Sequence, residues 1–163
     1  MSVVPELEAF LELAEFSRMT GKSQALHDLS PAQARLEFEM SAGVLDEPLP
    51  GVDSYDLRLP ARDGFSLPAR LYRAPQLTPQ PLPVVVYFHG GGYVIGSLDS
   101  HDGLCRRLAH AGQFAVLAVD YRLAPEWVFP TAVQDACDAV NWLLREGRQH
   151  GLDASRVAFA GDS

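Results

Sequence analysis

The chain has 163 residues, of which 47% are hydrophobic and 21% charged; this composition is typical of a globular domain with a hydrophobic core and unlike that of a disordered or fibrous chain. Its 13 basic and 21 acidic side chains leave a formal net charge of −8 at pH 7. Because this charge repels phosphate backbones and anionic membrane surfaces, we expect no nucleic-acid partner.

The sequence predicts neither a transmembrane segment nor a secretory signal. The longest uninterrupted apolar run, Phe114 to Val119, is far shorter than the roughly 20 residues that a membrane-spanning helix needs. The first residues, Met1 to Glu6, lack the basic and apolar regions of a signal peptide. We therefore expect a cytoplasmic protein.

The two cysteines, Cys105 and Cys137, fall in predicted helices, and no second pair completes a metal-ligand pattern. We expect two reduced, partly buried thiols. We expect neither a bound metal nor a cofactor.

Residues 1–48 predict helices only. Between Glu6 and Arg18, apolar residues recur at spacings of three and four and so share one helix face: Leu7, Phe10, Leu11 and Ala14. The acidic residues of this helix are typical of a solvated face: Glu6, Glu8, Glu12 and Glu15. Ser30 supplies an N-cap and Pro31 a first-turn proline for a second helix that reaches about Met40.

An antiparallel hairpin is predicted next. From Val52 to Leu59, and again from Phe65 to Leu71, apolar and polar residues alternate, which is the period of a strand with one buried face. Arg62-Asp63-Gly64 supplies the turn between them. A loop must follow, because four prolines that cannot donate to a sheet stand close together: Pro75, Pro79, Pro81 and Pro83.

The remainder alternates strands and helices. Strands are predicted at Val84 to Phe88, Phe114 to Val119 and Arg156 to Ala160, with helices from about Leu98 to Ala111 and from Pro130 to about Arg148. This alternation predicts a parallel sheet with right-handed crossovers. One apolar stripe of the second helix is expected to pack on the sheet: Ala132, Val133, Ala136, Val140, Leu143 and Leu144.

Three glycines, Gly90 to Gly92, follow His89 directly after the strand that ends at Phe88. Consecutive glycines cost backbone entropy, so they are typical of a loop whose N–H groups must point at a ligand. In acyl transfer that ligand is the oxyanion of the tetrahedral intermediate. A tight turn is the plain structural alternative, and a phosphate loop is disfavoured because no lysine follows the glycines.

Gly161-Asp162-Ser163 follows another strand. Gly-x-Ser at a strand end is the first part of a nucleophile elbow, whose sharp turn lifts the serine oxygen off the sheet. The tripeptide alone also makes helix caps and turns in many proteins. Together with the glycine loop, it predicts an acyl-transfer site with Ser163 as the nucleophile.

Other assignments of the polar residues are less favoured. A triad of His89, Asp120 and Ser163 would have the chain order of all-β proteases, which this helix-alternating chain does not resemble. Hydrolases whose Gly-Asp-Ser-Leu motif opens the chain are disfavoured because the tripeptide comes late here. The other histidines are predicted to be surface residues: His27, His101, His110 and His150. Asp99 and Asp102 are predicted to start a helix.

In three motifs the chain resembles the hormone-sensitive-lipase-like branch (bacterial family IV) of the α/β-hydrolase carboxylesterases. These motifs are His89 to Gly92, Gly161 to Ser163, and Asp120 to Glu126 followed by Phe129-Pro130 and a helix. One departure is that Trp127 and Val128 stand where the family usually has a histidine and a small or polar residue. We expect altered local packing there and no loss of a catalytic group.

The resemblance implies an α/β-hydrolase fold, with a mostly parallel sheet, an N-terminal antiparallel hairpin and an N-terminal helical lid. It implies two units, a lid segment at 1–48 and the N-terminal half of the core at 49–163, truncated after the nucleophile strand. It further implies that the apolar faces of the lid helices line an acyl pocket.

For function, the resemblance implies a serine carboxylesterase or lipase of short to medium acyl esters, with Ser163 as nucleophile and the N–H groups of Gly91 and Gly92 as oxyanion donors. His89, Gly90 and Asp162 would shape the site. The triad acid and histidine are expected beyond Ser163. A small-molecule ester is the expected partner, and a homodimer stays open. Two alternatives also stay open: a non-catalytic fragment serving as a binding or subunit module, and the same fold acting on amide, thioester or carbamate bonds.

Overall fold

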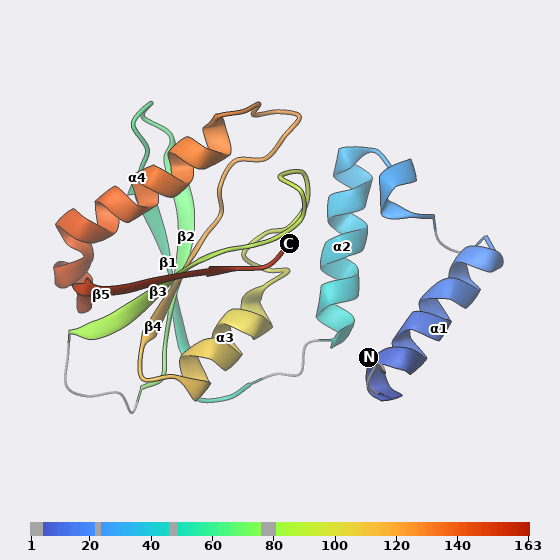
Figure 1. Cartoon of the computed structure of the whole chain (residues 1–163), viewed down its shortest axis with the longest axis horizontal. Coiled ribbons are helices and arrows are strands. Elements are labelled where there is room, and N and C mark those ends of the chain that lie inside the picture. The colour runs from blue at the N-terminus through green and yellow to red at the C-terminus, as the bar shows by residue number, and fades with distance from the viewer. Residues whose placement is uncertain (1–4, 22–23, 46–48, 76–80) are drawn as a thin grey trace.

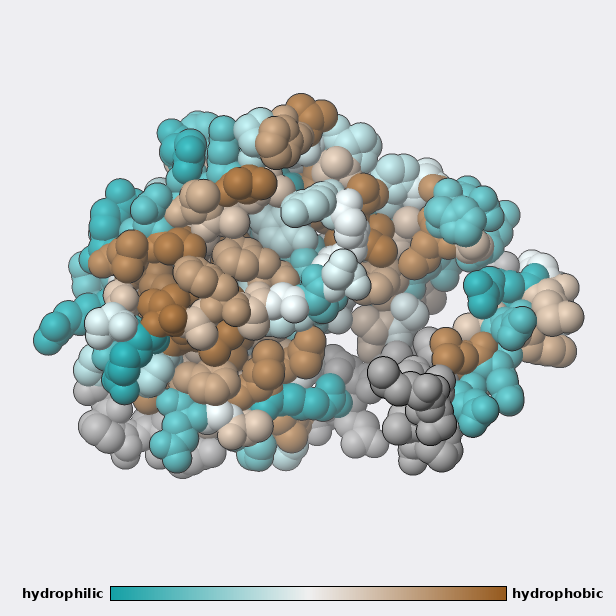
Figure 2. All heavy atoms as spheres, in the orientation of Figure 1, coloured by the Kyte–Doolittle hydropathy of each residue, from teal (hydrophilic) through white to brown (hydrophobic). Residues whose placement is uncertain are grey.

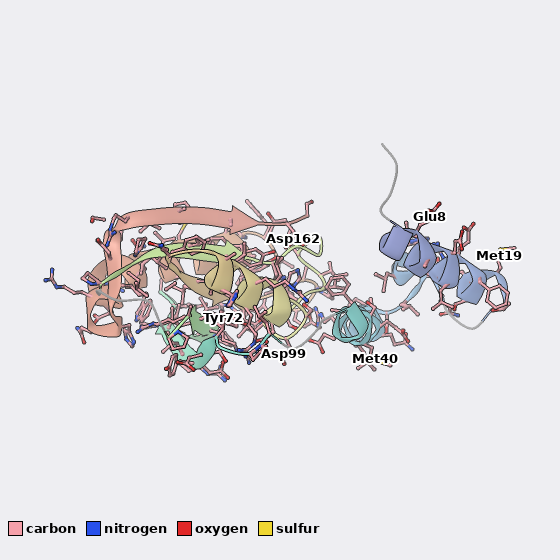
Figure 3. All side chains as sticks on the ribbon, turned by 90° about the horizontal axis from the view of Figure 1, so that it is seen from below. Glu8, Met19, Met40, Tyr72, Asp99 and Asp162 are labelled. Atoms are coloured by element: carbon pink, nitrogen blue, oxygen red, sulfur yellow. The ribbon has the colours of Figure 1, made fainter. Side chains whose placement is uncertain are left out.

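The computed structural model describes residues 5–21, 24–45, 49–75 and 81–163. Three helical segments come first: α1 (Pro5–Met19), the short 3-10 helix η1 (Leu26–Asp28) and α2 (Pro31–Leu45). Figures 1 and 3 show α2 against the body of the protein and α1 beyond it, on the side away from the sheet. The second helix thus extends past its predicted end at Met40.

A five-stranded mixed sheet forms the body, in the order β1-β2-β4-β3-β5. Its strands are β1 (Asp53–Pro60), β2 (Ser66–Arg73), β3 (Leu82–Phe88), β4 (Ala115–Val119) and β5 (Leu152–Gly161). The strands β1 and β2 form the predicted antiparallel hairpin, and β2 pairs antiparallel with β4. The strand β3 runs parallel to both β4 and β5, as the alternation predicted.

One helix covers each face of this sheet (Figure 1): α3 (Asp102–Ala111) and α4 (Thr131–Glu146), the latter followed by the 3-10 helix η2 (Gly147–His150). Alternate residues of β3 divide between the two faces. Val84 and Val86 share a buried cluster with Trp142 of α4. Tyr87 belongs to the cluster on the other face, with Cys105 of α3. This two-sided burial explains why the central strands read as unbroken apolar runs.

The start of α3 and the buried face of α4 differ from prediction. Side-chain bonds tie Ser97 and Ser100 to each other's backbone N–H groups, at 2.8 and 3.1 Å. Such local bonds compete with helix formation, so α3 begins at Asp102 instead of about Leu98. On α4, Val133 and Leu144 are exposed, and the carboxylates of Asp135 and Asp138 are buried in their place. The apolar-stripe prediction was therefore wrong for these two residues.

The reason lies in two arginines outside the helix. The Asp135 carboxylate binds the Arg122 guanidinium at 2.6 Å, and the Asp138 carboxylate binds Arg62 at 2.9 Å. A buried carboxylate is tolerated when a positive charge pairs with it. These two ion pairs therefore allow the face of α4 that carries Asp135 and Asp138 to pack against the sheet. The same orientation leaves Cys137 exposed, against the prediction, whereas Cys105 is buried.

Several large apolar side chains remain exposed on the body. Figure 2 shows hydrophobic surface over the front of the molecule, where β5 and α4 lie. Phe159 is 62% exposed on β5, which is an edge strand of the sheet. Within the described residues, none of the helices has the length and apolar character to cross a membrane.

The predicted domain boundary after residue 48 lies next to residues 46–48, which are outside the described part of the chain. Residues 76–80 of the predicted loop and the side chains of Glu6, Leu7 and Phe10 are also outside it. Of the predicted face of α1, Leu11 is exposed and Ala14 is half-buried. The lid assignment of these helices stays a prediction.

Candidate active site

Two neighbouring parallel strands bring the predicted motifs to one edge of the sheet. Phe88, the last residue of β3, pairs with Gly161, the last residue of β5. His89 and Asp162, the residues that follow these two strands, therefore leave the sheet side by side, each within its own motif. In Figure 1, the chain end marked C lies beside the loop that follows β3.

A cavity of about 410 Å³ opens where these segments meet. Residues 88–93, Tyr121 and residues 161–163 line it, and the first turns of α4 close one side with Ala132, Val133 and Ala136. All six predicted site residues are among the lining residues: His89, Gly90, Gly91, Gly92, Asp162 and Ser163. No described residue of α1 or α2 lines it.

The glycine loop needs its glycines for two separate reasons. Gly91 has φ +118°, and a Cβ there would lie 2.3 Å from the carbonyl oxygen of Ile95. A Cβ on Gly90 would lie 2.3 Å from Oδ2 of Asp162. A side chain at either position would therefore displace the loop or the end of β5.

This cavity-lining loop has backbone donors that are unpaired within the described part of the chain. The carbonyl of Gly91 accepts hydrogen bonds from the N–H groups of Val94 and Ile95, both at 3.0 Å, which fixes the turn. Among the described residues, no acceptor pairs with the N–H groups of Gly91 and Gly92. Unpaired donors beside a serine hydroxyl are the arrangement that an oxyanion hole requires.

Asp162 holds the glycine loop to the end of β5. Its Oδ1 accepts hydrogen bonds from the Tyr87 hydroxyl at 2.5 Å and from the N–H of Gly90 at 2.9 Å. Burial tends to raise the pKa of this carboxyl, but these hydrogen bonds and the nearby His101 outweigh it, so the pKa lies below its ordinary value. Asp162 is therefore an anion at neutral pH.

His89 packs beneath the loop as a neutral ring. It is 5% exposed, its ring stacks on Tyr121 at 4.3 Å between centroids, and Nδ1 lies 2.8 Å from the carbonyl oxygen of Gly90. Because that carbonyl can only accept, Nδ1 carries the proton. Burial lowers the pKa of His89, which keeps the ring uncharged.

One histidine in this region was placed wrongly from sequence. His101 is 7% exposed, not a surface residue, and its Nε2 lies 3.3 Å from the Asp162 carboxylate. No spacing or motif signals it, because the contact joins the start of α3 to the end of β5. Of the other histidines predicted on the surface, His27 and His110 are exposed, whereas His150 is half-buried against Trp142.

The third motif, Asp120 to Glu126, contacts the start of the glycine loop through Tyr121. The Tyr121 hydroxyl donates to the carbonyl of His89. The buried Arg122 guanidinium packs over the rings of Phe65 and Trp127, 4.5 and 4.7 Å from their centroids. Trp127 thus takes part in a cation–π contact. The altered packing expected from its departure from the family pattern stays a prediction.

The remaining predicted carboxylates lie elsewhere. Asp102 is the first residue of α3, and both Asp102 and Asp99 bind the Arg70 guanidinium, at 3.1 and 2.8 Å. Neither lines the cavity, and neither does Asp120. Within the described part of the chain, no cluster of His, Cys, Asp or Glu could hold a metal ion.

Comparison with known proteins identifies the class to which this geometry belongs. Residues 85–163 match a family model described as an alpha/beta hydrolase fold. Along 100% of its length the chain is 50% identical to an ethyl acetate hydrolase of Pseudomonas putida, of which it covers 52%. Over 58% of its length it is 52% identical to the esterase LipI of Mycobacterium tuberculosis, of which it covers 30%.

Solved structures give the same result. The whole chain superposes on 49% of a hyperthermophilic esterase from Pyrobaculum calidifontis, with a TM-score of 0.82 and 38% identity. It also superposes, over 99% of its length, on 50% of a thermostable esterase from Pseudomonas putida, with a TM-score of 0.86 and 32% identity. The chain therefore has the α/β-hydrolase fold. The relatives reported above are named as esterases or ester hydrolases, and the chain spans about half the length of those that it matches from end to end.

Proposed function

We propose that the full-length protein is a serine carboxylesterase that hydrolyses short to medium acyl esters through an acyl-enzyme on Ser163. The observation that carries this proposal is the cavity that Ser163 lines together with Gly91 and Gly92, whose N–H groups are unpaired among the described residues. The esterase names of the relatives support the same reaction class.

In the proposed mechanism the Ser163 hydroxyl attacks the ester carbonyl, and the carbonyl oxygen becomes an oxyanion. The N–H groups of Gly91 and Gly92 donate to that oxyanion, and each well-aimed donor lowers the barrier by about 3 kcal/mol. The ester C–O bond then breaks, and the alcohol leaves with the proton that the Ser163 hydroxyl gave up. Water hydrolyses the acyl-serine to the carboxylic acid and free Ser163. His89, Gly90 and Asp162 keep the donors in place and do not touch the reacting atoms.

The serine also needs a base, because a protonated hydroxyl is a poor nucleophile. No hydrogen bond joins Ser163 to either buried histidine near the cavity. Nδ1 of His89 faces the Gly90 carbonyl and Nε2 of His101 faces Asp162, while Nε2 of His89 is buried without a hydrogen-bond partner in the described part of the chain. We propose that the histidine and the acid come from sequence beyond residue 163, in the chain order Ser, Asp or Glu, His that α/β hydrolases use.

We also propose a domain division and a cellular location for the protein. Residues 1–48 would form a lid segment over the core that starts at residue 49, and the protein would act in the cytoplasm. A homodimer stays a prediction, which light scattering on the full-length protein tests.

The test compares hydrolysis of p-nitrophenyl acetate and butyrate by the full-length protein and by two serine variants. Ser163→Ala should lower kcat/KM by more than about 10³-fold, because the nucleophile is lost. Ser66→Ala, a change at an exposed serine on β2, should leave it unchanged. Wild-type rates in Ser163→Ala would refute the proposal.

A further inference from the structure

One carboxylate connects the two halves of the proposed site. Asp162 directly precedes Ser163, and its Oδ1 binds the N–H of Gly90, which directly precedes the proposed oxyanion donors. A shift of this carboxylate therefore moves the nucleophile and the donors relative to each other. Figure 3 shows Asp162 at the end of β5 where the strand meets the rest of the site.

His101 is the histidine that contacts this carboxylate, and its tautomer follows from its partners. A carboxylate can only accept, so Nε2 of His101, 3.3 Å away, carries a proton and donates it to Asp162. On the other side of the ring, Nδ1 lies 2.8 Å from the Ser100 hydroxyl. Both ring nitrogens are thus engaged, which fixes the plane of the imidazole.

Packing holds the ring in this orientation. Phe38 of α2 and Tyr87 of β3 both pack near it, each with its ring centroid 6.0 Å away. His89 lies 5.5 Å away by the same measure. His101 therefore sits between α2 and the sheet, and its 7% exposure leaves it no room to turn toward solvent.

His101 is nevertheless separate from the chemistry. It is not among the residues that line the cavity, so it does not contact a substrate there. Asp162, by contrast, has a side chain that is 43% exposed. Without the Nε2–H of His101, Oδ1 of Asp162 keeps the Tyr87 hydroxyl and the N–H of Gly90, but Oδ2 loses its donor. The carboxylate then gains solvation by rotating Oδ2 toward water, which weakens its alignment on Gly90.

We propose that His101 is a positioning residue of the acyl-transfer site: its Nε2–H holds the Asp162 carboxylate on Gly90 and so aligns the N–H groups of Gly91 and Gly92 with Ser163. This inference rests on the proposed function. Loss of the hydrogen bond acts on the transition state, where the oxyanion forms, and leaves ground-state binding of the ester almost unchanged.

The experiment measures kcat and KM for p-nitrophenyl butyrate with the full-length protein and three variants. His101→Phe keeps a buried ring but has no donor. His101→Gln retains an N–H at a similar reach. His110→Phe makes the same change at an exposed histidine of α3, the helix that directly follows His101. It serves as the matched control.

His101→Phe should lower kcat by about 10- to 100-fold, part of the 10²–10³ that a whole oxyanion donor is worth, with KM changed by less than about 3-fold. Binding of a boronic acid that forms a tetrahedral adduct should weaken in parallel with kcat/KM. His101→Gln should recover most of the loss, and His110→Phe should match the wild type.

Should His101→Phe fail to fold, Ser100→Ala removes the Nδ1 partner while keeping the imidazole, and it should lower kcat by several-fold with KM unchanged. A folded His101→Phe with wild-type kcat, or a loss confined to KM, overturns the role of His101 while the esterase proposal stands. A wild-type protein that neither hydrolyses esters nor binds the boronic acid overturns the proposed function and the role of His101 with it.

Discussion

The buried guanidinium of Arg122 gives a direct test of how α4 is held on the sheet. Its Nη2 and Nε donate to the Asp135 carboxylate at 2.6 and 2.9 Å, and Asp135 is 0% exposed. In Arg122→Met the carboxylate stays buried without a counter-charge. Removing one partner of a buried ion pair costs about 3–5 kcal/mol, so the free energy of unfolding of the full-length protein should fall by that amount.

Urea unfolding followed by far-UV circular dichroism measures this loss without relying on the fluorescence of Trp127, which contacts Arg122. Arg145→Met changes an exposed arginine on α4, the helix that carries Asp135. It should alter the free energy of unfolding by less than about 0.5 kcal/mol. The double variant Arg122→Met/Asp135→Leu removes both charges and should recover most of the stability. Equal stabilities for Arg122→Met and Arg145→Met would show that Asp135 does not depend on this counter-charge.

Three further changes test other parts of the structure in the full-length protein. Gly91→Ala places a Cβ 2.3 Å from the Ile95 carbonyl oxygen at φ +118° and should lower kcat/KM by about 10²-fold. Gly43→Ala, in open space on α2, should leave kcat/KM unchanged. Equal activities of the two variants would argue against a rigid glycine loop. Burial raises the pKa of Asp120 to about 6, above the roughly 3.9 of an unfolded chain. The folded state therefore binds more protons between these values, and stability falls as the pH rises through them. Asp120→Asn should thus raise the urea midpoint near neutral pH and lose that advantage below the unfolded pKa; a pH-independent difference would contradict this origin. Arg35→Met removes the 2.7 Å ion pair to Glu126 and the bonds to the carbonyls of Val94 and Ala124. Limited proteolysis should then cut the α2 segment faster than in Arg18→Met, a change on α1, and equal rates would show that Arg35 does not anchor α2.

Much of the fold follows from sequence because local patterns determine it. Alternation in residues 52–71 predicted the hairpin, and the unbroken apolar run at Val84 to Phe88 predicted a strand covered on both faces. The glycine run and Gly161-Asp162-Ser163 each follow a parallel strand, so their meeting at one sheet edge could be expected from topology alone. The structure brings all six predicted site residues to one cavity.

Features that depend on distant partners were not predictable. Asp135 and Asp138 were not part of the apolar stripe predicted to pack on the sheet, because nothing in α4 reveals that Arg122 and Arg62 meet them. His101 likewise has no local signal, since its partner lies at the end of β5. In each case a buried polar side chain is tolerated through a contact with a residue outside its own element, and a single sequence does not show which distant residues pair.

The central claim, that Ser163 is an activated nucleophile, is tested most directly by covalent labelling. The full-length protein is incubated with a fluorophosphonate, digested and analysed by peptide mass spectrometry. The proposed function predicts one adduct, on the peptide that contains Ser163, and a parallel loss of ester hydrolysis. An unmodified Ser163 peptide in fully folded protein, or an adduct on another serine that abolishes the activity, would contradict it.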